Sequence, residues 1–77
     1  MILIDVRTKG EYDAGHAENS MLCDIMEMMA GKFPDVSKDE EIVLCCESGN
    51  RAMMAKTLME RAGFTNVTNG GCVENFM

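Results

Sequence analysis

Short continuous apolar runs alternate along the chain with stretches in which apolar residues recur at helical spacing. The runs at residues 2–6 and 42–45 are nearly uninterrupted, which is the pattern of strands buried on both faces of a sheet. Two weaker runs, at residues 20–23 and 64–68, predict a brief second strand and a short final strand. The pattern therefore predicts four strands, with the one at residues 42–45 in the centre of the sheet.

Polar residues ahead of the periodic stretches predict where two short helices begin. Thr8 and Glu11 have the spacing of a capping box, and Gly15 follows at a position suited to end the helix. Asp24 offers another amino-terminal cap, ahead of a Met-rich helix that we expect to run to about Gly31.

A longer amphipathic helix is predicted over residues 50–62, where small and apolar side chains recur every three or four positions before Gly63. Residues 34–41 predict a loop, residues 69–71 a turn and residues 72–77 a truncated last helix. Strands that alternate with helices imply an α/β fold, with a small parallel sheet flanked by helices on both faces. A chain of 77 residues is enough for one domain, spanning 1–77.

Composition and charge narrow the classes of partner and compartment. The formal net charge of −6, without a basic cluster, makes nucleic acid an unfavourable partner. No apolar stretch approaches the ~20 residues of a membrane-spanning helix, and no signal peptide is visible, so we expect no membrane partner and a cytoplasmic location. We also expect a monomer. The four cysteines lack the pattern of a disulfide framework or a zinc site, so they are interpreted as thiols and no metal is expected.

The main chemical candidate is Cys46, which stands where the predicted central strand ends. Five residues, ending in Arg51, separate it from the body of the predicted helix, and Gly49 permits tight curvature between them. In such a strand-loop-helix arrangement, backbone N–H groups and the positive end of the helix dipole can point at one anion. Cysteines at helix amino termini beside a cation are reactive, because the thiolate is the nucleophile.

Arg51 strengthens this hypothesis, because a cation in the first turn of a helix opposes the dipole and needs a compensating partner. An anionic substrate would supply one. The alternative is an ordinary loop, with Arg51 paired to Asp5 or Asp24.

Segments along nearly the whole chain resemble rhodanese domains in order and spacing. They are Leu3-Ile4-Asp5-Val6-Arg7, Glu11-Tyr12, Gly15-His16, Cys46-Glu47-Ser48-Gly49-Asn50-Arg51, Ala62-Gly63-Phe64-Thr65-Asn66-Val67 and Gly70-Gly71. The resemblance implies a thiosulfate sulfurtransferase without cofactor, in which Cys46 takes sulfane sulfur from thiosulfate or another persulfide donor. The acceptor would be a thiol, cyanide or a protein. By the same resemblance, the substrate would be bound by Glu47, Ser48, Gly49, Asn50 and Arg51. Asp5 and Arg7 stand at the carboxyl end of a predicted strand, where a buried pairing is expected to brace the loop.

Two alternatives stay open. Rhodanese-fold phosphatases and arsenate reductases have five residues between cysteine and arginine, whereas four intervene between Cys46 and Arg51. A noncatalytic sulfur-relay or binding module is the other alternative, because Glu47 puts a negative charge where an anionic donor would bind.

Four further residues are interpreted as structural. His16 follows the first helix in a Gly-His pair and is expected to have a structural role. Cys45 should face away from Cys46 by strand alternation. Cys23 and Cys72 are expected to pack, although Cys72 could act as a resolving thiol.

Overall fold

The computed structural model describes all 77 residues and contains one four-stranded parallel sheet. The strands are β1 (Ile2–Asp5), β2 (Met21–Leu22), β3 (Ile42–Cys46) and β4 (Val67–Cys72). Their order across the sheet is β2-β1-β3-β4, so the predicted central strand has a partner on each side. The α/β class predicted from the sequence is confirmed.

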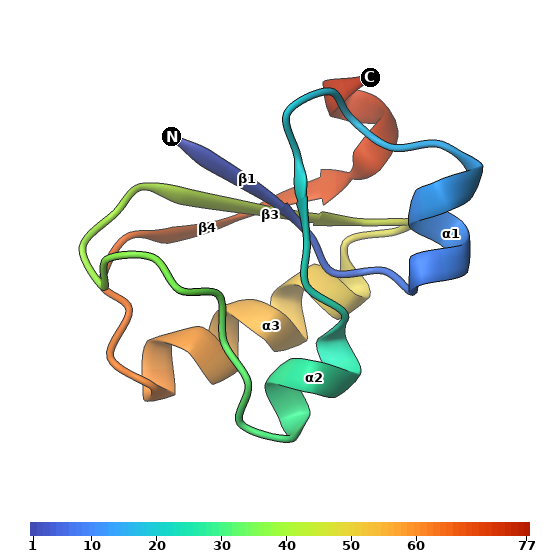
Figure 1. Cartoon of the computed structure of the whole chain (residues 1–77). Coiled ribbons are helices and arrows are strands. Elements are labelled where there is room, and N and C mark those ends of the chain that lie inside the picture. Colours follow the sequence, from blue (N-terminus) through green and yellow to red (C-terminus); the bar gives the residue numbers. More distant parts are fainter.

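The helices occupy both faces and one end of this sheet (Figure 1). They are α1 (Lys9–Ala14), α2 (Ile25–Met29), α3 (Asn50–Arg61) and the 3-10 helix η1 (Val73–Phe76). Figure 1 shows α2 and α3 together on one side of the sheet, η1 on the other side, and α1 beside the carboxyl ends of the strands. The carboxyl edge of a parallel sheet is where ligand sites form in α/β folds.

Local sequence signals explain where the first two helices begin. The Thr8 side chain accepts a hydrogen bond from the Glu11 amide, and the Glu11 side chain accepts one from the Thr8 amide, so the predicted capping box is present. The Asp24 carboxylate accepts from the Met26 amide and starts α2. The predicted extension of α2 to about Gly31 is wrong, because the helix ends at Met29.

The apolar side chains form two separate clusters, one on each face of the sheet. This division is what near-continuous apolar strands predict, because alternate side chains point to opposite faces. The larger cluster lies on the α2–α3 face and comprises Ile4, Val6, Ile25, Met28, Ile42, Leu44, Cys46, Ala52, Ala55, Met59, Phe64 and Val67. The smaller cluster comprises Leu3, Ala17, Cys45 and Val73.

The carboxyl-terminal part of the chain differs from the prediction. The last strand begins at Val67 instead of residue 64, and residues 69–71 belong to it instead of forming a turn. Gly70 is required there, because a Cβ at this position would lie 2.7 Å from side-chain atoms of both Val43 and Phe76. Gly71 adopts a left-handed φ of 81°, beside a register irregularity between β3 and β4. The predicted last helix shortens to the 3-10 turn η1.

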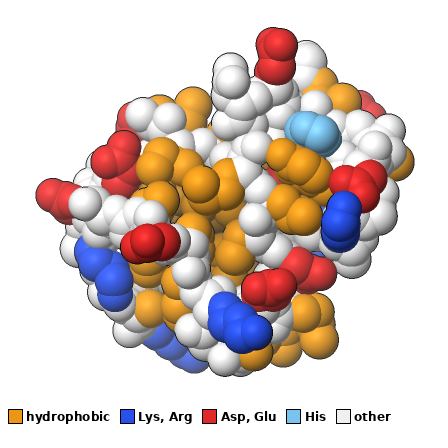
Figure 2. All heavy atoms as spheres, viewed as in Figure 1, with side chains coloured by type: hydrophobic (Ala, Val, Ile, Leu, Met, Phe, Trp, Pro, Cys, Tyr) orange, Lys and Arg blue, Asp and Glu red, His pale blue; other side chains and the backbone are white.

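The surface has an open hollow on the side of β2, away from the loop that follows β3. Figure 2 shows hydrophobic side chains in the middle of this face with charged groups around them. The largest cavity, about 360 Å³, is lined by Met21, Cys23, Phe33 and neighbouring residues, and by none of the residues between Cys46 and Arg51. No helix has the length and apolar character needed to cross a membrane.

Candidate active site

Cys46 ends β3, and its sulfur lies where the loop into α3 begins. The side chain is fully buried, and Sγ accepts hydrogen bonds from the backbone N–H groups of Gly49, at 3.0 Å, and Ala52, at 3.4 Å. N–H dipoles aimed at one sulfur, together with the amino terminus of α3, stabilise negative charge on that sulfur. The surroundings of Sγ therefore suit a sulfur nucleophile.

The loop reaches this geometry through Gly49. This residue is the amino-terminal cap of α3 and has φ 93° and ψ −9°, a left-handed conformation that favours glycine. No side chain caps α3 at this point. Ser48 Oγ accepts from the Asn50 amide at 3.5 Å, within the loop itself. Two amides of the loop and first helical turn are thus left to meet the Cys46 sulfur.

Cys45 and Cys46 are adjacent in sequence but belong to opposite faces of the sheet. Cys46 lies in the larger core cluster and Cys45 in the smaller one, as strand alternation predicted. Burial, followed by the nearby charge of Asp5, raises the pKa of the Cys45 thiol to about 11. Cys45 is therefore protonated at neutral pH, which makes this thiol a poor nucleophile.

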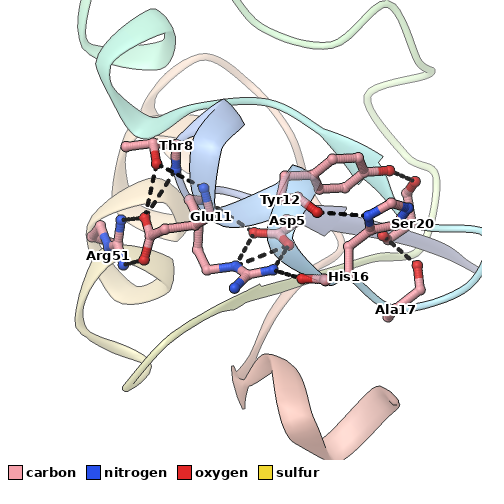
Figure 3. A network of polar contacts seen from close by, with 10 residues as sticks. Asp5, Thr8, Glu11, Tyr12, His16, Ala17, Ser20 and Arg51 are labelled. Atoms are coloured by element: carbon pink, nitrogen blue, oxygen red, sulfur yellow. Dashed lines mark hydrogen bonds and ion pairs between the residues drawn. The ribbon is translucent and has the colours of Figure 1, made fainter.

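Arg51 pairs with Glu11, and not with Asp5 or Asp24 as the sequence suggested. The guanidinium donates to both carboxylate oxygens of Glu11, at 2.6 and 2.9 Å (Figure 3). This hydrogen bonding, with a further contribution from the Thr8 backbone, lowers the pKa of Glu11 to about 2, and the pair raises the pKa of Arg51. The alternatives Asp5 and Asp24 are not its partners. Glu11 links α1 to the first turn of α3 and supplies the charge compensation that Arg51 needs.

Asp5 and Arg7 form the second ion pair at this end of the sheet. Both residues are buried, and Arg7 donates to the two Asp5 oxygens at distances from 2.8 to 3.1 Å. Arg7 also donates to the Gly15 carbonyl at 2.7 Å, which ties β1 to the end of α1. The buried pairing expected from the sequence is present, but it braces the end of α1, through Gly15, and not the loop after Cys46. His16 stacks on Tyr12, with ring centroids 3.7 Å apart, in keeping with a structural role.

The outer part of the loop is open to solvent. Glu47 and Asn50 are exposed. Glu47 lines a cavity of about 230 Å³, together with Arg7, Glu11, Cys72 and other residues. Cys72 pairs in register with Cys46 across the β3–β4 ladder and is half-buried. Three carboxylates line this cavity, because Glu74 joins Glu47 and Glu11.

Two residues near the site were not identified as functional candidates from the sequence. The sequence predicts a capping box at Glu11 and places it in a segment that resembles rhodanese domains, but neither signal identifies it as the partner of Arg51. Asn69 was assigned to a turn, whereas its side chain donates to the Gly49 carbonyl at 3.1 Å. No sequence signal marked this contact.

Comparisons with known proteins agree with the fold. A model of the Rhodanese-like domain matches residues 1–74. The senescence-associated protein DIN1 of Raphanus sativus is 36% identical over 83 residues, which cover 91% of this chain and 45% of that protein. The thiosulfate sulfurtransferase PspE of Escherichia coli K12 is 30% identical over 71 residues, which cover 88% of this chain and 66% of PspE. The chain spans less than half the length of DIN1.

Solved structures show the same fold. A rhodanese-like domain protein from Staphylococcus aureus has a TM-score of 0.84 at 21% identity, covering 99% of this chain and 72% of that one. A rhodanese from Escherichia coli, determined with anions, has a TM-score of 0.80 at 26% identity, covering 96% of this chain and 88% of that one. With a family model matching residues 1–74 of 77, the chain belongs to the rhodanese-like domain family.

Proposed function

We propose that this protein is a sulfurtransferase that carries sulfane sulfur as a persulfide on Cys46. The observation that carries the proposal is the pair of backbone N–H groups, from Gly49 and Ala52, that point at Cys46 Sγ. The relation to the thiosulfate sulfurtransferase PspE supports the same chemistry.

The reaction has two displacements on sulfur. In the first, the Cys46 thiolate attacks the sulfane sulfur of the donor, the bond between donor and sulfur breaks, and the donor leaves with the electron pair. With thiosulfate, the leaving group is sulfite. In the second, the thiolate of an acceptor attacks the outer sulfur of the persulfide, and Cys46 leaves as a thiolate. No electrons are gained or lost overall, so no redox cofactor is needed.

The loop supplies the electrostatic part of this chemistry. The N–H groups of Gly49 and Ala52 stabilise the negative sulfur before attack and after its release. Exposed loop residues, namely Glu47, Ser48 and Asn50, meet the donor or acceptor. Arg51 lies in the first turn of α3 with its charge compensated by Glu11, so its direct contact with a substrate anion stays a prediction.

One observation keeps a second function in view. Glu47 adds an exposed negative charge, and the positive charge of Arg51 is compensated by Glu11. The residues between Cys46 and Arg51 therefore offer no uncompensated cation to bind a small dianion. A relay module that receives sulfur from a partner protein fits this charge pattern. A phosphatase or arsenate reductase fits it poorly, because both reactions bind multiply charged anions and because four residues, instead of five, separate Cys46 from Arg51.

Mass spectrometry after incubation with thiosulfate, and separately with a low-molecular-weight persulfide, tests the proposal. We expect the wild type to gain one sulfur atom from at least one donor and to release it to a thiol. Cys46→Ser should gain none, whereas Cys45→Ser, which changes the adjacent thiol, should load like the wild type. Loading by the persulfide without turnover of thiosulfate would identify the relay module. Sulfur retained by Cys46→Ser would contradict the proposal.

A further inference from the structure

Asn69 connects the last strand of the sheet to the loop that surrounds Cys46. Its side-chain Nδ2 donates to the Gly49 carbonyl at 3.1 Å, and its Oδ1 accepts from the Gly71 amide at 2.9 Å. Gly49 is the residue whose own amide donates to Cys46 Sγ at 3.0 Å. The half-buried Asn69 side chain on β4 is thus connected to the reacting sulfur through one residue, Gly49.

The Gly49 carbonyl receives two hydrogen bonds at once. The Met53 amide donates to it at 3.0 Å, closing the first turn of α3, and Asn69 donates to the same oxygen. A carbonyl oxygen has two lone pairs, so this acceptor is fully used. The Met53 contact fixes Gly49 relative to α3, whereas the Asn69 contact fixes it relative to the sheet from which Cys46 projects.

The packing around Gly49 leaves the loop little else to hold it against β4. A Cβ on Gly49 would lie 3.4 Å from the Gly71 Cα, so the two glycine backbones are close neighbours. Neither glycine carries a side chain that could pack, and α3 has no side-chain cap at Gly49. The Asn69 amide is therefore the polar contact that joins this part of the loop to β4.

We propose that Asn69 is a positioning residue for sulfur transfer, which it serves by holding Gly49 so that the Gly49 amide points at Cys46 Sγ. This inference rests on the proposed function at Cys46. Small displacements of a group that stabilises charge are costly, and a misplacement of about 1 Å can reduce a rate by about 10²-fold. Preorganised donors keep their effect only when their neighbours fix them.

Two variants separate positioning of the loop from simple support of β4. Asn69→Asp keeps the oxygen that accepts from Gly71 but loses the donor to Gly49, and Asn69→Ala loses both contacts without adding charge. Asn66→Asp is the matched control, because Asn66 is exposed just before β4 and makes no side-chain hydrogen bond. We expect kcat for sulfur transfer to fall about 10- to 100-fold in both Asn69 variants. The control should keep the wild-type kcat.

The Gly49 amide proton gives a readout that does not depend on turnover. In the reduced, unloaded protein, its NMR resonance should move upfield in both Asn69 variants, as expected when the bond to Sγ weakens, and stay in place in Asn66→Asp. A wild-type protein that takes up no sulfur would remove the proposed function, while this shift would still test the role of Asn69. Asn69→Asp with wild-type kcat and an unshifted Gly49 resonance would overturn the inference.

A measurement on the wild type covers the case in which the variants do not fold. The Asn69 side-chain amide protons should shift when Cys46 is loaded with sulfur or alkylated, because the change at Sγ reaches them through Gly49. The side-chain amide of Asn75, which donates to the Gly70 carbonyl at 3.3 Å, is the internal reference and should shift less. Unchanged Asn69 resonances would show that the contact does not respond to the chemistry at Cys46.

Discussion

Glu11 and Arg51, forty residues apart in the chain, form a two-point ion pair that ties α1 to the loop around Cys46. Each side chain is about one-third exposed, with a relative accessibility of 32%. The same Glu11 carboxylate also completes the capping box with Thr8. A single residue therefore starts a helix and anchors the loop.

The depressed pKa of Glu11 predicts how stability depends on pH. Because pairing with Arg51 and the Thr8 backbone lowers the pKa from 4.5 to about 2, the contribution is fully present above the unfolded-state value and is lost as pH falls toward 2. Glu11→Gln keeps a side chain that serves in a capping box but removes the charge. We expect the free energy of unfolding of this variant to be about 1 kcal/mol lower at pH 7. Its stability should also fall less steeply than that of the wild type as the pH is lowered. Urea unfolding from pH 7 to 2.5 measures both effects.

Asp13→Asn is the control for Glu11→Gln, because it removes a carboxylate of the same helix. Asp13 pairs with Lys9, and both side chains are more than half exposed. An exposed pair of this kind contributes little, so stability should change by less than about 0.5 kcal/mol. Equal losses in the two variants would show that the geometry of the Glu11–Arg51 pair adds nothing.

The buried pair of Asp5 and Arg7 predicts a larger effect. Arg7→Met would leave the Asp5 carboxylate, which is fully buried, without its main partner. Breaking a buried pair in this way costs about 3–5 kcal/mol. Lys9→Met, at an exposed position two residues later, should change stability by less than about 0.5 kcal/mol. Denaturant unfolding compares the stabilities of the two variants. A loss of unfolding free energy under about 1 kcal/mol in Arg7→Met would mean that water reaches Asp5.

The order of the elements and the position of Cys46 could be predicted because they depend on local patterns. Nearly continuous apolar runs specified β1 and β3, and the loop length specified where α3 begins. The partner of Arg51 could not be predicted, because Asp5, Asp24 and Glu11 all carry the required charge. Only the placement of α1 beside the carboxyl ends of the strands brings Glu11, and neither aspartate, to Arg51.

The error at the last strand has a different origin. Asn69, Gly70 and Gly71 together have the composition of a turn, yet pairing with β3 overrides that preference. Gly70 is small because Phe76 and Val43 occupy the space above it, and this constraint comes from η1 and the neighbouring strand. A single sequence contains no signal for such a close approach.

The space around Gly70 and Gly10 predicts opposite effects for an alanine at the two positions. Gly70→Ala would place Cβ 2.7 Å from Phe76 and Val43 atoms, and overpacking of this kind costs about 1–3 kcal/mol. Gly10→Ala, inside α1, meets nothing nearer than 4.0 Å and should stabilise the protein by up to about 1 kcal/mol. Thermal unfolding of both variants tests this. If Gly70→Ala matched the wild type, η1 must move away easily.

The negative charge of Glu47 influences which sulfur donor the protein can bind. It is exposed and lines the cavity beside the loop, while the positive charge of Arg51 is compensated by Glu11. At ~6 Å and an effective dielectric constant of roughly 20–80, one like charge costs roughly 0.7–3 kcal/mol, and a dianion experiences it twice. Thiosulfate should therefore be a poor donor by KM, and a thiol persulfide with less charge a better one.

Glu47→Lys tests this electrostatic account. We expect the variant to lower KM for thiosulfate about tenfold or more at low ionic strength, with kcat nearly unchanged, because the Cys46 contacts stay in place. The gain should shrink at high salt, where the charges are screened. Glu18→Lys changes the net charge equally at an exposed position outside the cavity and should leave KM almost unaltered. Steady-state kinetics with thiosulfate at two salt concentrations compares the three proteins. If both variants lowered KM equally, net charge, and not the position of Glu47, would control access of the donor.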